Sequence, residues 1–149
     1  MYPVHRMKLD DAIVELERIM RLFICNHYKE ALAECERLVN HHFYFHVLKS
    51  LFQSMNGVVT FQDEFLDEAL NTTKTALTAV DKNRRKRSRF SRMIWTPDYD
   101  DYTDNECHAE GSYSILAACA AVMTIACEKT LMGLIKTGYW SKTAVDVLR

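Results

Sequence analysis

Apolar residues recur every three or four positions through the first 81 residues, which is the spacing of amphipathic helices. A first helix begins at Asp10 or Asp11, either of which could cap it, and its apolar face contains Ile13, Leu16, Ile19, Met20 and Phe23. Asn26-His27 predicts a turn, because asparagine tolerates the left-handed conformation. A second helix follows, and so short a connection makes the pair antiparallel; its apolar residues are Tyr28, Ala31, Leu32, Cys35, Leu38 and Val39.

A second helical pair is expected after the joint at His41-His42. The third helix runs to about Asn56, where Gly57 can end it, and carries Phe45, Leu48, Leu51, Phe52 and Met55. Thr60 and Asp63 have the spacing of a capping box, which predicts the start of a fourth helix. That helix carries the apolar residues Phe61, Phe65, Ala69, Leu70, Ala76, Leu77 and Val80.

The stretch 106–136 contains the most apolar run, because Thr124 is the only polar residue from Ile115 to Cys127. That run is too short for a hydrocarbon layer of ~30 Å, which needs roughly 20 residues. A helix that is apolar all round belongs in the middle of a helical core, so we expect the other helices to pack around it. Thr103 and Glu106 have the capping-box spacing that would start this helix.

After a break near Glu128–Thr130, a last helix is expected to fold back on this apolar helix. Its apolar residues are Leu131, Leu134, Ile135, Trp140, Val145 and Leu148, and Gly133 and Gly138 weaken the prediction. The chain of 149 residues has only four glycines and two prolines, which favours long helices over a sheet with many turns. We predict a single all-α domain over 1–149, with about six antiparallel helices in three hairpins and a charged loop at 82–105.

The net charge of −1 gives no overall attraction to nucleic acid or to a membrane, so nucleic acid is not expected as a partner. The five cysteines form no CxxC pair, and Cys35, Cys119 and Cys127 lie among apolar residues, as buried thiols do. This favours a reducing compartment. The first residues, MYPVHRMKLDDA, lack the apolar core of a signal peptide, and a cytoplasmic location is the simplest expectation.

The sharpest local feature is a basic run of seven residues: Lys82, Arg84, Arg85, Lys86, Arg87, Arg89 and Arg92. Such a loop could bind anionic lipid, with about 1 kcal/mol from each basic residue, or other phosphates. Five acidic residues at 98–106 would offset much of this field within a Debye length of ~8 Å. A solvated or self-pairing loop is therefore the other interpretation.

Three constellations could carry catalysis or a metal. His108-Ala109-Glu110 matches the H-x-E of zinc deaminases, but the P-C-x-x-C partner motif is missing, and Glu110 equally suits the positive start of a helix. His42 and His46 share a helix face without a third ligand nearby in sequence, although Cys35 or His108 could complete the set in space. A Cys–His nucleophile pair would lack a Gly-rich oxyanion loop. We therefore predict no catalytic residue, no metal site and no cofactor, and a metal-dependent hydrolase or deaminase is the least favoured hypothesis.

The turn Asn26-His27-Tyr28-Lys29-Glu30-Ala31 resembles the Gly-Asp-Tyr-x-Glu-Ala turn of a tetratricopeptide repeat. The longer pattern resembles the N-terminal part of the tetratricopeptide repeat protein 39 family, which includes the fungal inclusion-body clearance proteins. It comprises Thr60-Phe61-x-Asp63 followed by Ala69-Leu70, His108-Ala109-Glu110 at the start of the Ala-rich helix, and Leu134-Ile135-Lys136-x-Gly138, and the likeness covers about Asp11 to Ser141. Two departures are the shorter chain and Gly111, where a larger apolar residue is expected.

The resemblance implies a tetratricopeptide-like helical array that acts as a non-catalytic, intracellular scaffold or adaptor, linked in some members to lipid handling or aggregate clearance. We predict that the chain binds another protein. The alternative is a peripheral membrane or lipid-droplet module recruited through 82–92. If the last hairpin normally packs on a following repeat, its outer face is left bare in this chain, which predicts a homo-oligomer formed through that hairpin. Most aromatic residues are expected in the core, with a minority lining a groove between hairpins.

Overall fold

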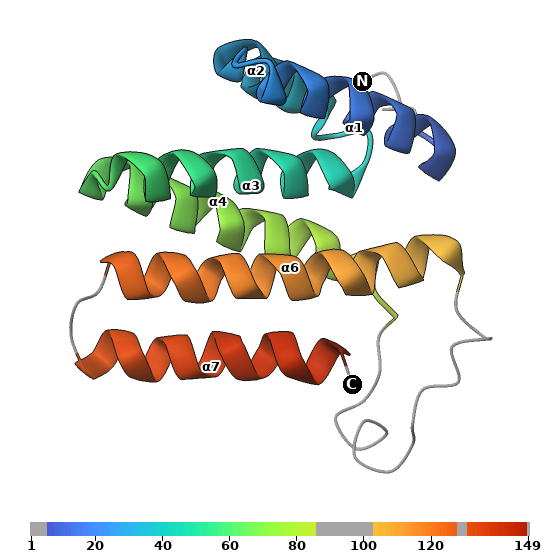
Figure 1. Cartoon of the computed structure of the whole chain (residues 1–149). Helices are drawn as coiled ribbons and strands as arrows, with labels where there is room; N and C mark the ends of the chain where they lie inside the picture. Colours follow the sequence, from blue (N-terminus) through green and yellow to red (C-terminus); the bar gives the residue numbers. More distant parts are fainter. Residues whose placement is uncertain (1–5, 86–102, 128–130, 149) are drawn as a thin grey trace.

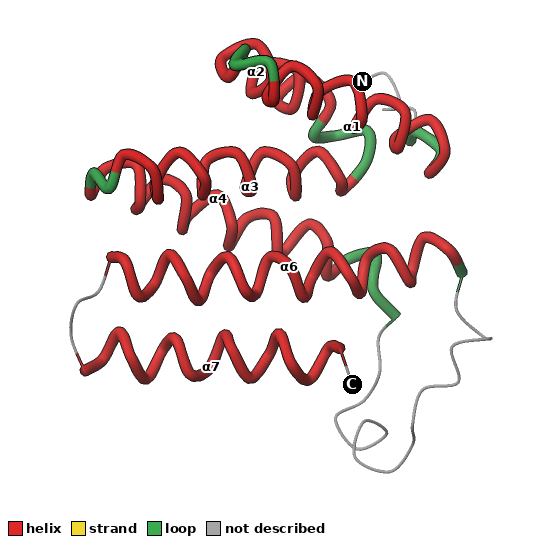
Figure 2. Tube along the Cα trace, viewed as in Figure 1, coloured by secondary structure: helices red, strands yellow, loops and turns green. Residues whose placement is uncertain are grey.

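The computed structural model describes residues 6–85, 103–127 and 131–148, and over these residues the chain is α-helical without strands (Figure 1). The helices are α1 (Leu9–Ile24), α2 (Tyr28–Leu38), α3 (Phe43–Thr60), α4 (Asp63–Asp81), α6 (Asp104–Cys127) and α7 (Leu131–Leu148). They form three antiparallel hairpins, α1/α2, α3/α4 and α6/α7, as the tube in Figure 2 shows. The predicted all-α array of about six helices in three hairpins is confirmed.

The first hairpin turns at Asn26, which has the positive φ of 65° that the sequence predicts. The start of α1 differs from the prediction. Lys8 is the N-cap residue and makes no side-chain cap bond, whereas Asp10 and Asp11 lie within the first turn. Their carboxylates therefore act on the positive end of the helix dipole rather than as caps.

The corner between α3 and α4 departs most from the prediction. Gly57 does not end α3, since the helix continues to Thr60 and Phe61 provides the left-handed cap residue with φ of 53°. Thr60 does not start α4, because its hydroxyl donates to the carbonyl of Asn56 one turn back. Gly57 instead allows a close approach: a Cβ there would lie 3.2 Å from the Phe65 carbonyl oxygen and 3.3 Å from Leu66 Cδ2.

The capping box at the start of α6 is present as predicted. The Thr103 N–H donates to Glu106 Oε2 at 3.0 Å, and the Glu106 N–H donates to Thr103 Oγ1 at 3.3 Å. From this start α6 packs against α3, α4 and α7.

The buried residues divide into two main groups on the two sides of α3. Phe45, Leu48 and Phe52 of α3 join Ile19, Ala31, Cys35 and Leu38 of the first hairpin. Phe43 and Val47 join α4 and α6, together with Ala76, Leu77, Val80, Ala109, Leu116 and Ala120. The expectation that the other helices surround α6 thus holds for α3, α4 and α7, while α1 and α2 pack on α3 (Figure 1).

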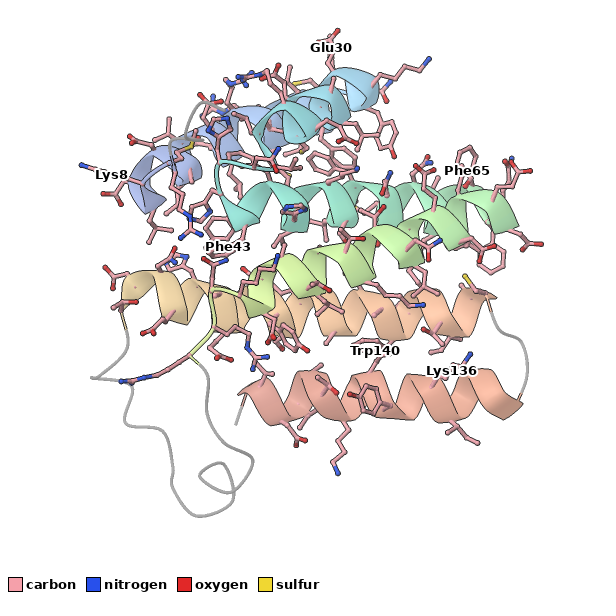
Figure 3. The ribbon with its side chains drawn as sticks, turned by 180° about the vertical axis from the view of Figure 1, so that it is seen from behind. Lys8, Glu30, Phe43, Phe65, Lys136 and Trp140 are labelled. Carbon is pink, nitrogen blue, oxygen red and sulfur yellow. The ribbon has the colours of Figure 1, made fainter. Side chains whose placement is uncertain are left out.

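The last hairpin is held by apolar packing and by a side-chain bond from Ser114 Oγ to the carbonyl of Ala144 at 3.1 Å. Trp140 packs against the cluster between α3, α4 and α6, and Figure 3 shows its side chain pointing toward α6. Two residues that the sequence placed on the inner face point outward, because Ile135 is 61% exposed and Val145 is 47% exposed. Gly133 and Gly138 lie within the helix and do not interrupt it.

At 24 residues, α6 is also long and apolar enough to cross a membrane by length and composition. A core helix passes the same test, and 44% of its most apolar window is buried inside the molecule. The polar residues at its start and its packing against three helices assign α6 to the helical array.

Candidate protein-interaction surface

Arg84, at the base of the predicted basic site, belongs to the packing of the molecule. Its side chain is only 8% exposed and bridges two helices, with Nη2 lying 2.9 Å from Glu110 Oε2 on α6 and Nη1 lying 3.2 Å from Asp81 Oδ1 on α4. The guanidinium also lies 3.9 Å from the centre of the Tyr113 ring, which is a cation–π geometry. Arg84 therefore cannot serve an anionic partner without breaking these contacts.

The other predicted basic residues are placed only in part. Lys82 is exposed and is the residue that follows α4, and Arg85 is half-buried. Lys86, Arg87, Arg89 and Arg92 lie outside the described residues. Arg84 thus makes contacts within the molecule, and the binding of an anionic partner by the basic run stays a prediction.

A cluster of aromatic and imidazole rings joins the start of α3 to the start of α6. His42 caps α3, because its Nδ1 accepts the Tyr44 N–H at 3.3 Å, and its Nε2 then donates to Asn105 Oδ1 at 3.3 Å. The Tyr44 hydroxyl hydrogen-bonds His108 Nδ1, and the two rings meet edge-on with centroids 5.7 Å apart. Burial lowers the pKa of His42 and raises the pKa of Tyr44.

These contacts separate the residues of the H-x-E motif. His108 faces Tyr44, Ala109 is buried, and Glu110 binds Arg84. Among the residues that the structure describes, no group of three His, Cys, Asp or Glu side chains could hold a metal ion. The motif therefore has structural partners at each of its positions.

Two of the five cysteines, Cys35 and Cys119, have thiols shielded by burial. Cys35 is buried in the first hairpin, where burial raises the pKa of its thiol to about 12, and burial also raises the pKa of Cys119. A thiol with a raised pKa is a poor source of the thiolate that a nucleophile or a metal ligand requires. Both residues act as small apolar side chains.

The feature that the sequence interpretation missed is an exposed apolar stripe along α6. Ile115, Val122 and Ile125 are 51–53% exposed, and Gly111 and Ala118 lie on the same line. These five residues follow the spacing of four, three, four and three residues that marks the seam of a coiled coil. That spacing was readable in the sequence, but a helix rich in Ala and Ile hides it because its buried faces are equally apolar.

α3, which packs against α6, is also apolar and exposed in its second half. Met55 and Val58 are each 46% exposed, and Leu51 is half-buried. No charged residue lies between His108 and Ile125 on the exposed line of α6. This arrangement is an uncharged strip suited to packing rather than to catalysis.

Comparison with known families agrees with this architecture. The family model Iml2/Tetratricopeptide repeat protein 39 matches residues 18–149, which covers most of the chain. No solved structure matches the chain. With three helical hairpins in an array and a match over this range, the chain belongs to the Iml2/Tetratricopeptide repeat protein 39 family.

Proposed function

We propose that this chain is a non-catalytic scaffold or adaptor that works in the cytoplasm by binding another protein. Tetratricopeptide-type families generally mediate protein interactions and are generally non-catalytic, which supports the coarse assignment. The single observation that carries the proposal is the uncharged, exposed stripe on α6, because contiguous exposed apolar surface marks interaction sites. The role that the resemblance implies, in lipid handling or aggregate clearance, is a prediction that builds on this proposal.

The experiment is capture of partners by the full chain in living cells. Proximity labelling with the tagged chain is compared with labelling by an unrelated helical protein of similar size and charge, and each candidate is then tested as a purified protein. We expect saturable binding of at least one candidate with defined stoichiometry. If no candidate exceeds the control, or if none binds when purified, the scaffold function is wrong.

The alternative is recruitment to an anionic membrane through residues 82–92. Basic residues gather in this segment, whereas the six helices carry sixteen acidic and eight basic residues, a net charge of −8. The test replaces Lys86, Arg87 and Arg89 by glutamate and measures binding to vesicles that contain phosphatidylserine, at low and at physiological salt. Arg84 is left intact because it is part of the packing. Unchanged binding would exclude this mode of recruitment.

A further inference from the structure

We propose that exposed and half-buried apolar residues of α3 and α6 together form a docking strip for a basic amphipathic helix of a partner protein. The strip consists of Leu51, Met55 and Val58 from α3 and Ile115, Ala118 and Val122 from α6. This inference rests on the proposed scaffold function and gives it a surface and a class of partner.

The two halves of the strip face the same side of the molecule. α3 and α6 run in the same direction side by side, with both starts at one end (Figure 1). Tyr44 and His108 touch near these starts and fix the register. Seven residues make almost two helical turns, so each step of seven along both helices keeps the same face.

One such step from Tyr44 and His108 leads to Leu51 and Ile115, and the next leads to Val58 and Val122. Met55 and Ala118 lie between these pairs and are exposed as well. The strip therefore covers positions 51–58 of α3 and 115–122 of α6, seven residue steps on each helix, or about 10 Å at 1.5 Å per residue.

The geometry of the strip selects a helix as its occupant. Two parallel helices whose apolar residues repeat every three and four positions leave holes between them at the spacing of the a and d residues of a third helix. Ala118, in the middle, allows that third helix to approach closely. The strip is long enough for about two turns of a partner helix.

The charge of the surrounding helices selects a basic partner. Over residues 43–85 and 103–127 the chain carries eight carboxylates against five basic residues, a net charge of −3, and Arg84 already pairs with two of the eight, Asp81 and Glu110. The six other carboxylates are Asp63, Glu64, Asp67, Glu68, Asp104 and Glu106. Asp104 stands at one end of the exposed line of α6, and Asp63 and Glu64 stand at the corner where α3 ends. On the other side of α6, α7 adds Lys136, Lys142 and Asp146, which reduces the acidity only slightly.

A basic helix would thus meet an apolar centre with acidic ends. A second copy of this chain would instead bring another acidic surface to the strip, which opposes self-association there.

The first test uses a synthetic helix as the probe. A fluorescent peptide of about 18 residues, with leucine at the a and d positions and lysine elsewhere, is longer than the strip and extends past both of its ends. One control peptide has the same composition in scrambled order, and another has glutamate in place of lysine. We expect fluorescence anisotropy to show at least about tenfold tighter binding of the first peptide than of either control. A tenfold difference in Kd corresponds to a difference of ~1.4 kcal/mol in binding free energy.

Two variants of the chain locate the binding. Ala118→Glu places a charge in the middle of the strip at an exposed position, and Val14→Glu places the same charge at a 66% exposed apolar position on α1. We expect Ala118→Glu to weaken peptide binding about tenfold or more and Val14→Glu to change it less than about twofold, with circular dichroism unchanged in both. Equal binding by all three proteins, or by the scrambled or acidic peptide, would overturn the proposal.

The second test separates the strip from the scaffold function. Cellular partners are captured with the wild-type chain, Ala118→Glu and Val14→Glu. Loss of partners from Ala118→Glu alone supports the strip, and retention of the same partners by all three shows that the scaffold binds elsewhere. Absence of partners from all three contradicts the scaffold function itself. Binding of anionic vesicles that is sensitive to Ala118→Glu would show that the strip takes lipid and would overturn the helix as occupant.

Discussion

Gly57 and Gly111 both lie within helices, yet the same substitution should have opposite effects at the two positions. A Cβ at Gly111 meets nothing within 4 Å, whereas one at Gly57 would press on the Phe65 carbonyl oxygen at 3.2 Å. Gly111→Ala should therefore raise the free energy of unfolding by about 0.5–1 kcal/mol, because alanine favours the helix. Gly57→Ala should lower it by about 1–2 kcal/mol, because α4 has to move away.

Urea titration of both variants against the wild type checks this pair. An equal gain in both would mean that α3 and α4 approach less closely than described.

The ion pair of Arg84 and Glu110 should matter more for stability than its position at the edge of a basic loop suggests. Arg84→Met leaves Glu110, whose side chain is 21% exposed, without its partner and removes the contact over Tyr113. We expect a loss of about 2–3 kcal/mol in the free energy of unfolding, since breaking one side of a buried pair strands the other charge.

The matched control for this change is Lys82→Met, which removes a charge two residues away at an exposed position. It should change stability by less than about 0.5 kcal/mol. Comparable losses from the two variants, in thermal or urea unfolding, would show that Arg84 is not buried against α6.

At the scale of the element, the start of α3 depends on a neutral imidazole. His42 Nδ1 accepts the Tyr44 N–H while Nε2 donates to Asn105, and protonation of Nδ1 would remove the cap. Burial lowers the pKa of His42 below its ordinary value of 6.5, the Asn105 bond opposes this shift, and His108 adds to it. Because the unfolded chain binds the proton more readily, the stability from His42 is complete above pH 6.5 and is lost as the pH falls toward the folded pKa.

The measurement is the melting temperature of the wild type and of His42→Asn between pH 7.5 and 5. Asparagine can also cap a helix but does not titrate, so the variant should lose less stability over this range. His46 shares the direction, because burial and then Lys49 lower its pKa, so part of the pH dependence should remain. Identical pH profiles would contradict the role of His42.

The same capping-box spacing gave one right and one wrong helix start. Thr103 and Glu106 form the reciprocal bonds, whereas Thr60 is the last residue of α3 and bonds back to Asn56. The difference is tertiary: Gly57 lets α4 pack so close that α3 can continue for another turn before Phe61 reverses the chain. Helix number, type and order follow from periodicity, but this boundary depended on a contact between residues that are not adjacent in sequence.

At the scale of the whole molecule, the burial of a helix depends on how many other helices pack around it. The apolar composition of α6 predicts burial on all sides, but among the described helices only α3, α4 and α7 cover it, and Ile115, Val122 and Ile125 remain exposed. The candidate site was predicted from charge in the chain and stays a prediction, but at Arg84 the charge is engaged in contacts within the molecule. A basic residue in a charged run can be buried by a carboxylate 26 residues away, which local sequence does not reveal.

The predicted homo-oligomer can be tested at the outer face of α7. Ile135 is 61% exposed and Tyr139 is 65% exposed, and they lie four residues apart on one face of α7. α7 has two lysines and one aspartate, so a copy of α7 would meet little of the repulsion that the acidic α3, α4 and α6 impose. We expect weak self-association that grows with concentration, because burial of two such side chains contributes about 1.5–3 kcal/mol each.

Sedimentation velocity over a wide concentration range measures this association, and Ile135→Lys should abolish it. The control Val14→Lys changes a 66% exposed residue on α1 and should leave the association constant within about twofold. Because Ala118→Glu alters the strip on α6 and not the outer face of α7, it should not change self-association either. A wild-type chain that remains monomeric at the highest concentration would show that the face of α7 is not a self-association surface, and the docking strip would be unaffected by that result.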